Sequence, residues 1–278
     1  MTVKVVTDST SDLTPEIARE LGITVVPLYV HFGNEVYRDG VDLSTEDFYQ
    51  RLAQTKELPT TSAPSPGDFA KVFDELGKEA DEILAITISS RLSATYTAAM
   101  EGKELRKSKT RVEVIDSRWA ISALGLITTS AAKAAKAGGN LGEVIDATRR
   151  SMNKADIRII FDTLEYLKKG GRIGTAQAFL GSMLNMNPVL TIKDGITTGV
   201  TRLRSRAKAI DYVVDFVNGL PNIEEIAIED GTTPEEAQAL VDRLASRLPK
   251  ERVYRMKVSP VIGTHVGPHV IGIATIAG

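Results

Sequence analysis

The N-terminal segment decides the fold class of the chain. Residues 3–12 have the sequence VKVVTDSTSD, in which a short apolar run leads directly into hydroxyl and carboxylate side chains. The run at residues 3–6 predicts a strand that is covered on both faces, and Thr14-Pro15 predicts that a helix begins after it. A polar cluster at the carboxyl end of a buried first strand lies where open α/β sheets bind ligands, although a capped turn explains the same residues equally well.

Two later segments repeat this arrangement. A buried strand predicted at residues 82–88 opens into the hydroxyl-rich segment 89–96, and a third strand at residues 112–115 ends in Asp116-Ser117. Strands that alternate with helices at this spacing predict a parallel sheet with right-handed crossovers. Three neighbouring strands then bring hydroxyl and carboxylate side chains to one edge of the sheet. Capping explains each cluster alone, but the three together indicate a polar site.

A fourth polar segment follows none of these strands. Residues 59–68 have the sequence PTTSAPSPGD, with three prolines and four hydroxyls. Proline fixes φ and removes a donor, so we expect a stiff loop rather than a strand. Ser65 is the expected N-cap of a helix, with Pro66 at its first position and Asp68 completing a capping box. The hydroxyls of residues 60–62 would then lie just before a helix N-terminus, which favours an anion, although a well-capped loop is the simpler interpretation.

The length and the order of elements predict two domains. The chain has 278 residues, and domains of this class usually divide beyond about 250–300 residues. We expect an α/β/α domain around a parallel sheet at residues 1–155 and an α/β domain with a mixed sheet at residues 156–278, with the ligand between them. The hairpin signal Asp194-Gly195 supports antiparallel strands in the second domain. We also expect one strand over residues 23–32.

An apolar helix is expected in the second domain before that hairpin. Its apolar positions are Phe179, Leu180, Met183 and Leu184. Their spacing of three and four residues places them on one face of a helix.

Composition excludes several classes of function. The 34 basic and 36 acidic side chains give a net charge of −2, which argues against nucleic-acid binding. The chain has no cysteine, so disulfides, thiolate chemistry and cysteine metal sites are excluded. The start of the sequence has no signal-peptide pattern, and no apolar stretch approaches the ~20 residues of a membrane span, so we expect a soluble cytoplasmic protein. The sequence also lacks the phosphate-binding loop, the dinucleotide fingerprint and the hydrolase nucleophile elbow.

The last polar segment contains two of the three histidines. Residues 262–269 have the sequence IGTHVGPH, with His265 and His269 four residues apart. Because Gly267-Pro268 breaks a helix, we expect a turn here rather than a helical pair of metal ligands. His265, which lies between glycines, is the better candidate for pointing inward. Hydroxyls and an imidazole N–H can satisfy a carboxylate without a buried counter-charge, so this set of residues favours binding over catalysis.

Five segments, in order, resemble the DegV family. They are residues 7–13, 61–65, 89–96, 167–173 and 263–268. The resemblance implies a two-domain DegV-like α/β fold that holds one long-chain fatty acid between its domains. It also implies the binding subunit of a bacterial fatty-acid kinase, which presents the acyl carboxylate to a separate ATP-dependent kinase protein. A DegV protein of this kind has no ATP site of its own and needs no cofactor or metal, and it could contact a membrane transiently.

The resemblance also implies roles for particular residues. Thr61 and Ser93 would bind the carboxylate together with His265, and Ser62 and Thr264 are expected neighbours. The chain departs from the usual family pattern at three positions near these segments, which are Ala63, Ala94 and His269.

Three arginines are expected to contact the kinase. Arg172, in the segment KKGGRI at residues 168–173, matches a basic position tied to the kinase interaction in the family. Arg204 and Arg202 lie in a second such segment, and either could be the matching residue.

Two other functions fit the same residues. One is an acyl-ester hydrolase that uses Ser93 and His265, which requires a base within hydrogen-bonding reach of the serine. The other is a triose- or sugar-binding subunit of a related kinase, which would not retain a long-chain lipid.

Overall fold

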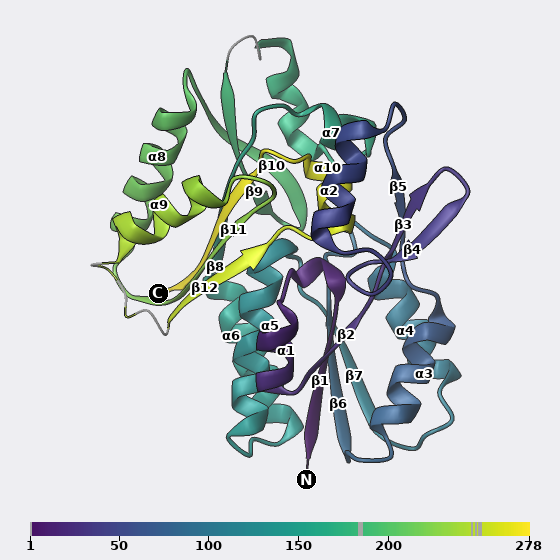
Figure 1. Ribbon diagram of the computed structural model, residues 1–278. Coiled ribbons are helices and arrows are strands. Elements are labelled where there is room, and N and C mark those ends of the chain that lie inside the picture. Colours follow the sequence, from purple (N-terminus) through teal and green to yellow (C-terminus); the bar gives the residue numbers. More distant parts are fainter. Residues whose placement is uncertain (1, 183–185, 246, 248, 250–251) are drawn as a thin grey trace.

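The computed structural model describes residues 2–182, 186–245, 247, 249 and 252–278, and these form three sheets (Figure 1). A four-stranded sheet has the order β2-β1-β6-β7, a six-stranded sheet has the order β10-β9-β8-β13-β11-β12, and a small sheet has the order β4-β3-β5. Among the described residues, no helix is both long and apolar enough to cross a membrane.

The four-stranded sheet is parallel throughout. Its strands are β1 (Val3–Asp8), β2 (Ile23–Val26), β6 (Glu82–Thr87) and β7 (Arg111–Asp116). Helices α1 (Pro15–Leu21), α5 (Ile121–Lys136) and α6 (Leu141–Lys154) cover one face, and α3 (Pro66–Leu76) and α4 (Thr95–Leu105) cover the other (Figure 1). Every residue of β6 is buried, as expected for a strand with helices on both sides. The predicted parallel α/β/α arrangement is confirmed.

Several helices begin where the sequence predicts. The Thr14 side chain accepts a hydrogen bond from the backbone N–H of Ile17 at the start of α1. Ser65 and Asp68 form the predicted capping box of α3. At the start of α2 (Thr45–Gln54), the Ser44 side chain accepts a hydrogen bond from the backbone N–H of Asp47. Each cap satisfies N–H groups that a helix start leaves without a partner.

The six-stranded sheet is mixed, as expected. Its strands are β8 (Ala155–Ile160), β9 (Asn187–Lys193), β10 (Ile196–Leu203), β11 (Ile223–Asp230), β12 (Val253–Lys257) and β13 (Ile271–Ala277). The β11–β12 pair is parallel and the other neighbours are antiparallel. Helices α8 (Arg206–Asn218) and α9 (Pro234–Leu244) pack on one face of this sheet around a separate apolar cluster.

Helix α5 joins the two large sheets. It contacts β1 of the first sheet and both β11 and β13 of the second, and most of its residues are buried. The largest apolar cluster therefore contains residues from both halves of the chain. Since the core is shared, the division of the chain after residue 155 stays a prediction.

The small sheet corrects two expectations. The expected strand over residues 23–32 is wrong, because β2 and β3 (Tyr29–Phe32) belong to different sheets. Pro27 lies between them and has no N–H for a continuous ladder. Residues 60–62 are not a loop but strand β5 (Thr60–Ser62), which pairs with β3, while β4 (Glu35–Arg38) pairs with the other side of β3. The flanking prolines lie outside these three residues and leave them free to pair.

Two segments near the C-terminal sheet also differ from expectation. His265 does not lie in a turn but in helix α10 (Pro260–Val266), which ends at Gly267 with φ of 82°. The predicted break at Gly267-Pro268 is confirmed, but a seven-residue helix of about two turns precedes it. Where an apolar α-helix was expected, residues 174–182 form the 3-10 helix η2 (Gly174–Ser182). Met183 and Leu184 of that expectation lie outside the described residues.

Candidate functional site

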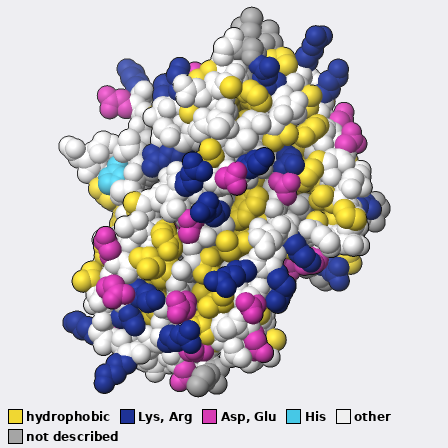
Figure 2. All heavy atoms as spheres, turned by 180° about the vertical axis from the view of Figure 1, so that it is seen from behind, with side chains coloured by type: hydrophobic (Ala, Val, Ile, Leu, Met, Phe, Trp, Pro, Cys, Tyr) yellow, Lys and Arg dark blue, Asp and Glu magenta, His cyan; other side chains and the backbone are white. Residues whose placement is uncertain are grey.

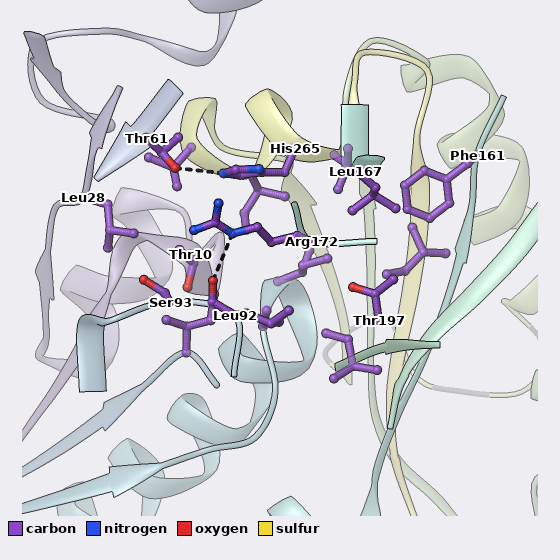
Figure 3. Close-up of a pocket in the computed structure, with 18 residues that line it drawn as sticks. Thr10, Leu28, Thr61, Leu92, Ser93, Phe161, Leu167, Arg172, Thr197 and His265 are labelled. Carbon is purple, nitrogen blue, oxygen red and sulfur yellow. Dashed lines mark hydrogen bonds between the residues drawn. The ribbon is translucent and has the colours of Figure 1, made fainter. Parts of the chain in front are cut away.

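A pocket lies between the carboxyl-end loops of the parallel sheet, helix α10 and one face of the mixed sheet (Figure 3). Its unfilled space is about 620 Å³, including the part that opens to solvent. Most lining side chains are aliphatic or aromatic, among them Ile88, Leu92, Ile121, Ile159, Phe161 and Ile192. The polar lining consists of Thr10, Thr61, Ser93, Arg172, Thr197 and His265.

Five separate segments deliver to this pocket the polar side chains other than Thr197, which lies on β10. Thr10 lies in the 3-10 turn η1 (Ser9–Ser11) after β1, and Ser93 lies in the loop between β6 and α4. Thr61 comes from β5 and His265 from α10, while Arg172 follows the short helix α7 (Glu165–Lys169). In Figure 3, the guanidinium group of Arg172 lies between the Thr61–His265 pair on one side and Ser93 and Thr10 on the other. The fold therefore gathers these groups at one end of the pocket.

Thr61 and His265 form a hydrogen-bonded pair. The distance between Thr61 Oγ1 and His265 Nε2 is 2.8 Å. Burial, and to a lesser extent the nearby positive charge of Arg172, lowers the pKa of His265 to about 4. The imidazole is therefore neutral at pH 7. Its Nδ1 atom is buried and has no hydrogen-bond partner among the described residues.

Gly170 allows helix α7 to pack against this imidazole. A Cβ atom built on Gly170 would lie 2.3 Å from His265 Nδ1, which no real side chain tolerates. Gly171, with φ of 72°, lets the backbone turn toward Arg172, whose Nη1 donates to the Gly170 carbonyl oxygen at 2.6 Å. The two glycines thus position the histidine and the arginine.

The Arg172 guanidinium group is held by backbone carbonyls rather than by a carboxylate. Its Nε donates to the carbonyl oxygen of Leu92 at 3.2 Å, in addition to the bond to Gly170. Arg172 forms no ion pair with any residue in the described parts of the chain. A positive charge in a half-buried, mostly apolar pocket without a counter-charge favours an anionic ligand.

The two remaining hydroxyls at this end have local partners. Ser93 Oγ lies 2.8 Å from Thr95 Oγ1 and also accepts from the Thr95 N–H at 3.3 Å. Thr10 Oγ1 donates to Asp8 at 2.5 Å. Burial raises the pKa of Asp8 to about 6, and its hydrogen bonds to Thr10 and Ile88 oppose that rise. Ser93 is therefore the freer of the two hydroxyls to donate to a ligand.

Several predicted site residues lie elsewhere. Ser62 is exposed, and its Oγ lies 2.8 Å from Nε2 of His31. Thr264 is buried inside α10 and donates to the Pro260 carbonyl oxygen at 2.9 Å. Neither residue lines the pocket. A direct role for Ser62 or Thr264 in binding therefore stays a prediction, and the positions of these residues do not favour it.

The three predicted partner-binding arginines separate in the structure. Arg172 lines the pocket, whereas Arg202 stacks over the Phe179 ring at 4.9 Å and Arg204 is exposed. His269, which departs from the family pattern, is exposed and contacts Asp162 at 3.2 Å, away from the pocket lining.

Sequence reasoning missed three features of the pocket. It placed Arg172 at a partner surface, although the glycine pair before it signals a close backbone approach. The polar cluster after the first strand predicted a site, but Thr10 was not named as one of its binding residues. Thr197 has no sequence signal, because a threonine in a strand is common on any sheet.

The geometry does not resemble a hydrolase or a metal centre. Ser93 bonds to Thr95 and not to His265, and no carboxylate in the described part of the chain bonds to Nδ1 of His265 to orient the ring. An activated serine needs both of these contacts. Within the described ranges, no group of three or more histidine, cysteine, aspartate or glutamate side chains is placed to hold a metal ion.

Comparison with known proteins places this fold in a family. A family model described as "Uncharacterised protein, DegV family" matches residues 2–278. A DegV domain-containing protein of Clostridium perfringens is 37% identical over 282 residues, covering 99% of this chain and 98% of the relative. The chain belongs to the DegV family.

Solved DegV structures share the whole architecture. A fatty-acid-binding DegV family protein from Thermus thermophilus is 35% identical, with a TM-score of 0.92 and complete coverage of both chains. A stearic-acid-binding protein from Eubacterium ventriosum is 28% identical, with a TM-score of 0.89, and the match covers 99% of this chain and 98% of the other. The predicted DegV resemblance and the two-part α/β fold class are both confirmed.

Proposed function

We propose that this DegV family protein binds a long-chain fatty acid in the pocket, with the carboxylate at the end formed by Thr61, Ser93, His265 and Arg172. The observation that carries the proposal is the division of the pocket into one polar, cationic end and a remaining wall of aliphatic and aromatic side chains. A monocarboxylic acid with a long apolar chain has the same division. The fatty-acid-binding relatives from Thermus thermophilus and Eubacterium ventriosum support this choice of ligand.

The carboxylate would be held by both charge and hydrogen bonds. Because His265 is neutral, its Nε2–H can donate to Thr61 Oγ1, which leaves the Thr61 O–H free to donate to the ligand. Arg172 supplies a counter-charge, in contrast to our expectation that hydroxyls and an imidazole N–H would suffice. A charge-assisted hydrogen bond contributes about 1.5–3 kcal/mol.

Burial of the acyl chain supplies most of the affinity. A chain of about fourteen methylenes gains roughly 11 kcal/mol, at about 0.8 kcal/mol for each buried methylene. The loss of translational and rotational freedom costs about 4 kcal/mol or more. The remainder is compatible with tight binding, so the apolar wall sets the affinity and the polar end sets the head group.

We further propose that the bound carboxylate is presented to a separate ATP-dependent kinase protein that forms the acyl phosphate. The polar end lies at the edge of the apolar pocket, and Ser62 and Ala94, which follow Thr61 and Ser93 in the sequence, are exposed. Lys and Arg side chains also gather across the middle of the face shown in Figure 2. The exposed Arg204 and the half-buried Arg202 would contact such a partner. The partner would then present an acidic surface to these two arginines. A cytoplasmic location, with transient membrane contact for lipid loading, fits this role.

The test of lipid binding is direct. The purified protein is extracted with solvent, the extract is analysed by mass spectrometry, and delipidated protein is titrated with stearic acid, stearyl alcohol and glyceraldehyde. We expect a released long-chain acid and saturable binding of stearic acid. Binding of glyceraldehyde without any fatty acid would instead support the sugar-binding alternative. Turnover of a chromogenic acyl ester, lost in Ser93→Ala, would support the hydrolase.

A further inference from the structure

Thr197 is a polar residue in the apolar part of the pocket. It lies on β10 opposite Ile192 of β9, and its side chain lines the pocket with Ile159 and Phe161. The residue is only 6% exposed. Its hydroxyl forms no hydrogen bond with any residue that the structure describes, whereas the other lining hydroxyls, those of Thr10, Thr61 and Ser93, all have partners.

The hydroxyl faces the pocket on the side away from the carboxylate end. In Figure 3, Thr197 lies with Phe161 on the second-sheet side, with its oxygen directed into the pocket, and the Arg172 guanidinium points the other way. The strand is fixed here, because Gly174, with φ of 54°, packs on it so closely that a Cβ atom would lie 2.2 Å from the Thr197 carbonyl oxygen. A β-branched side chain is also stiff at χ1. Thr197 therefore presents a fixed hydroxyl to the middle or far part of a bound chain.

A saturated acyl chain cannot satisfy this group. The Thr197 oxygen is open to the pocket, and an acyl chain that covered it would remove its access to water. A methylene chain has neither donor nor acceptor, so the covered hydroxyl would be left without a partner at a cost in free energy. A site built to hydrogen-bond a ligand hydroxyl discriminates strongly against an analogue that lacks it, whereas an apolar pocket only weakly rejects an added hydroxyl. A polar substituent on the acyl chain would remove the mismatch.

We propose that Thr197 is a specificity residue for the acyl chain, and that it favours a long-chain fatty acid with a hydroxyl group on the part of the chain that passes β10. This inference rests on the proposed function, since it concerns the tail of a ligand whose carboxylate lies at Arg172. Thr197 contributes nothing to recognition of the carboxylate. It selects among chains that the apolar wall accepts equally.

The test compares ligands that differ only in the tail. Dissociation constants are measured by displacement of a fluorescent fatty acid for stearic acid, oleic acid and a set of hydroxystearic acids that differ in the position of the hydroxyl. We expect the wild type to prefer one or two neighbouring hydroxy isomers over stearic acid. In Thr197→Val, which keeps the shape and removes the hydroxyl, this preference should fall by about tenfold. Stearic acid should bind the variant as tightly as the wild type or more tightly.

A neighbouring residue provides the matched control. Thr198 follows on the same strand, does not line the pocket, and donates to the Ile196 carbonyl oxygen at 3.2 Å. Thr198→Val should leave every preference unchanged. The inference would be overturned if Thr197→Val changed the dissociation constants of stearic and hydroxystearic acids equally. It would also be overturned if Thr197 produced a preference for oleic acid alone. Either result would leave fatty-acid binding itself intact. Failure of the wild type to bind any fatty acid would refute the proposed function itself.

Discussion

Arg172 provides the sharpest test of how the carboxylate is bound. In the structure its guanidinium group is anchored by the carbonyl oxygens of Leu92 and Gly170 and has no carboxylate partner among the described residues. Arg172→Gln keeps a hydrogen-bonding side chain of similar length and removes the charge. If the ligand carboxylate pairs with the guanidinium, its loss removes about 1.5–3 kcal/mol, or roughly 10- to 150-fold in affinity.

The assay must separate charge from packing. Stearic acid and stearyl alcohol have the same chain, but only the acid has a charge to stabilise. Arg172→Gln should weaken binding of the acid by the stated factor and change binding of the alcohol little. Arg204→Gln is the matched control, because Arg204 is exposed and lies outside the pocket lining, and it should leave both affinities unchanged.

A second readout reports on the same charge without a ligand. Burial is the larger cause of the low pKa of His265, and the positive charge of Arg172 is the second cause. In Arg172→Gln the His265 pKa, followed by NMR, should therefore rise toward its ordinary value while remaining depressed by burial. Unchanged acid affinity together with lost phosphorylation by a kinase would refute the pocket role and restore Arg172 to the partner surface. Equal losses for acid and alcohol would mean that Arg172 only shapes the loops.

Three further predictions follow, two from contacts in the pocket and one from Asp39, a buried carboxyl group that follows β4 and does not line the pocket. Thr61→Val and Ser93→Ala should each weaken stearic acid binding about 10- to 150-fold, with little effect on stearyl alcohol, and the double variant should lose less than the product, because both groups share one ligand carboxylate. Gly170→Ala should displace His265, since the new Cβ would lie 2.3 Å from Nδ1 of the imidazole. We expect weaker binding of stearic acid in titrations, and unchanged binding would show that the α7–His265 contact is not needed. Burial raises the pKa of Asp39 from 3.8 to about 7, so ionisation of the unfolded chain destabilises the fold as the pH rises from about 4 to 7. Denaturant unfolding should therefore show Asp39→Asn gaining up to about 4 kcal/mol relative to the wild type between pH 4 and 8, and a constant difference across that range would contradict the assigned pKa.

Local sequence signals predicted the first half of the fold well. The strand at Val3 and the fully buried strand at Glu82 carry their own patterns, and the caps at Thr14 and Ser65 fix helix starts through contacts within four residues. Such features need no knowledge of distant parts of the chain. The failures occurred where distant pairing decides the structure. Residues 60–62 became a strand only because β3 offers an open edge.

The site shows the same division between local and distant causes. The resemblance named Thr61, Ser93 and His265, and the structure brings all three to one pocket. It does not follow that their chemistry could be derived from the sequence. The neutral state of His265 depends on its burial beneath α7 and on the positive charge of Arg172, which is 93 positions earlier in the sequence.

The position of Arg172 changes how the two parts of the proposed function relate. An arginine on the surface would serve only the kinase partner, and the carboxylate would be bound by neutral groups alone. Under the proposed function, an arginine in the pocket wall would instead contact the carboxylate before any partner arrives, and the carboxylate oxygens are the atoms that a kinase would phosphorylate. Phosphorylation would add negative charge next to the same guanidinium group, which would stabilise the acyl phosphate through charge-assisted hydrogen bonds. Binding of the acid and retention of its phosphorylated form would then depend on one residue, and the kinase would need to supply only the nucleotide, the metal and a surface that meets Arg202 and Arg204.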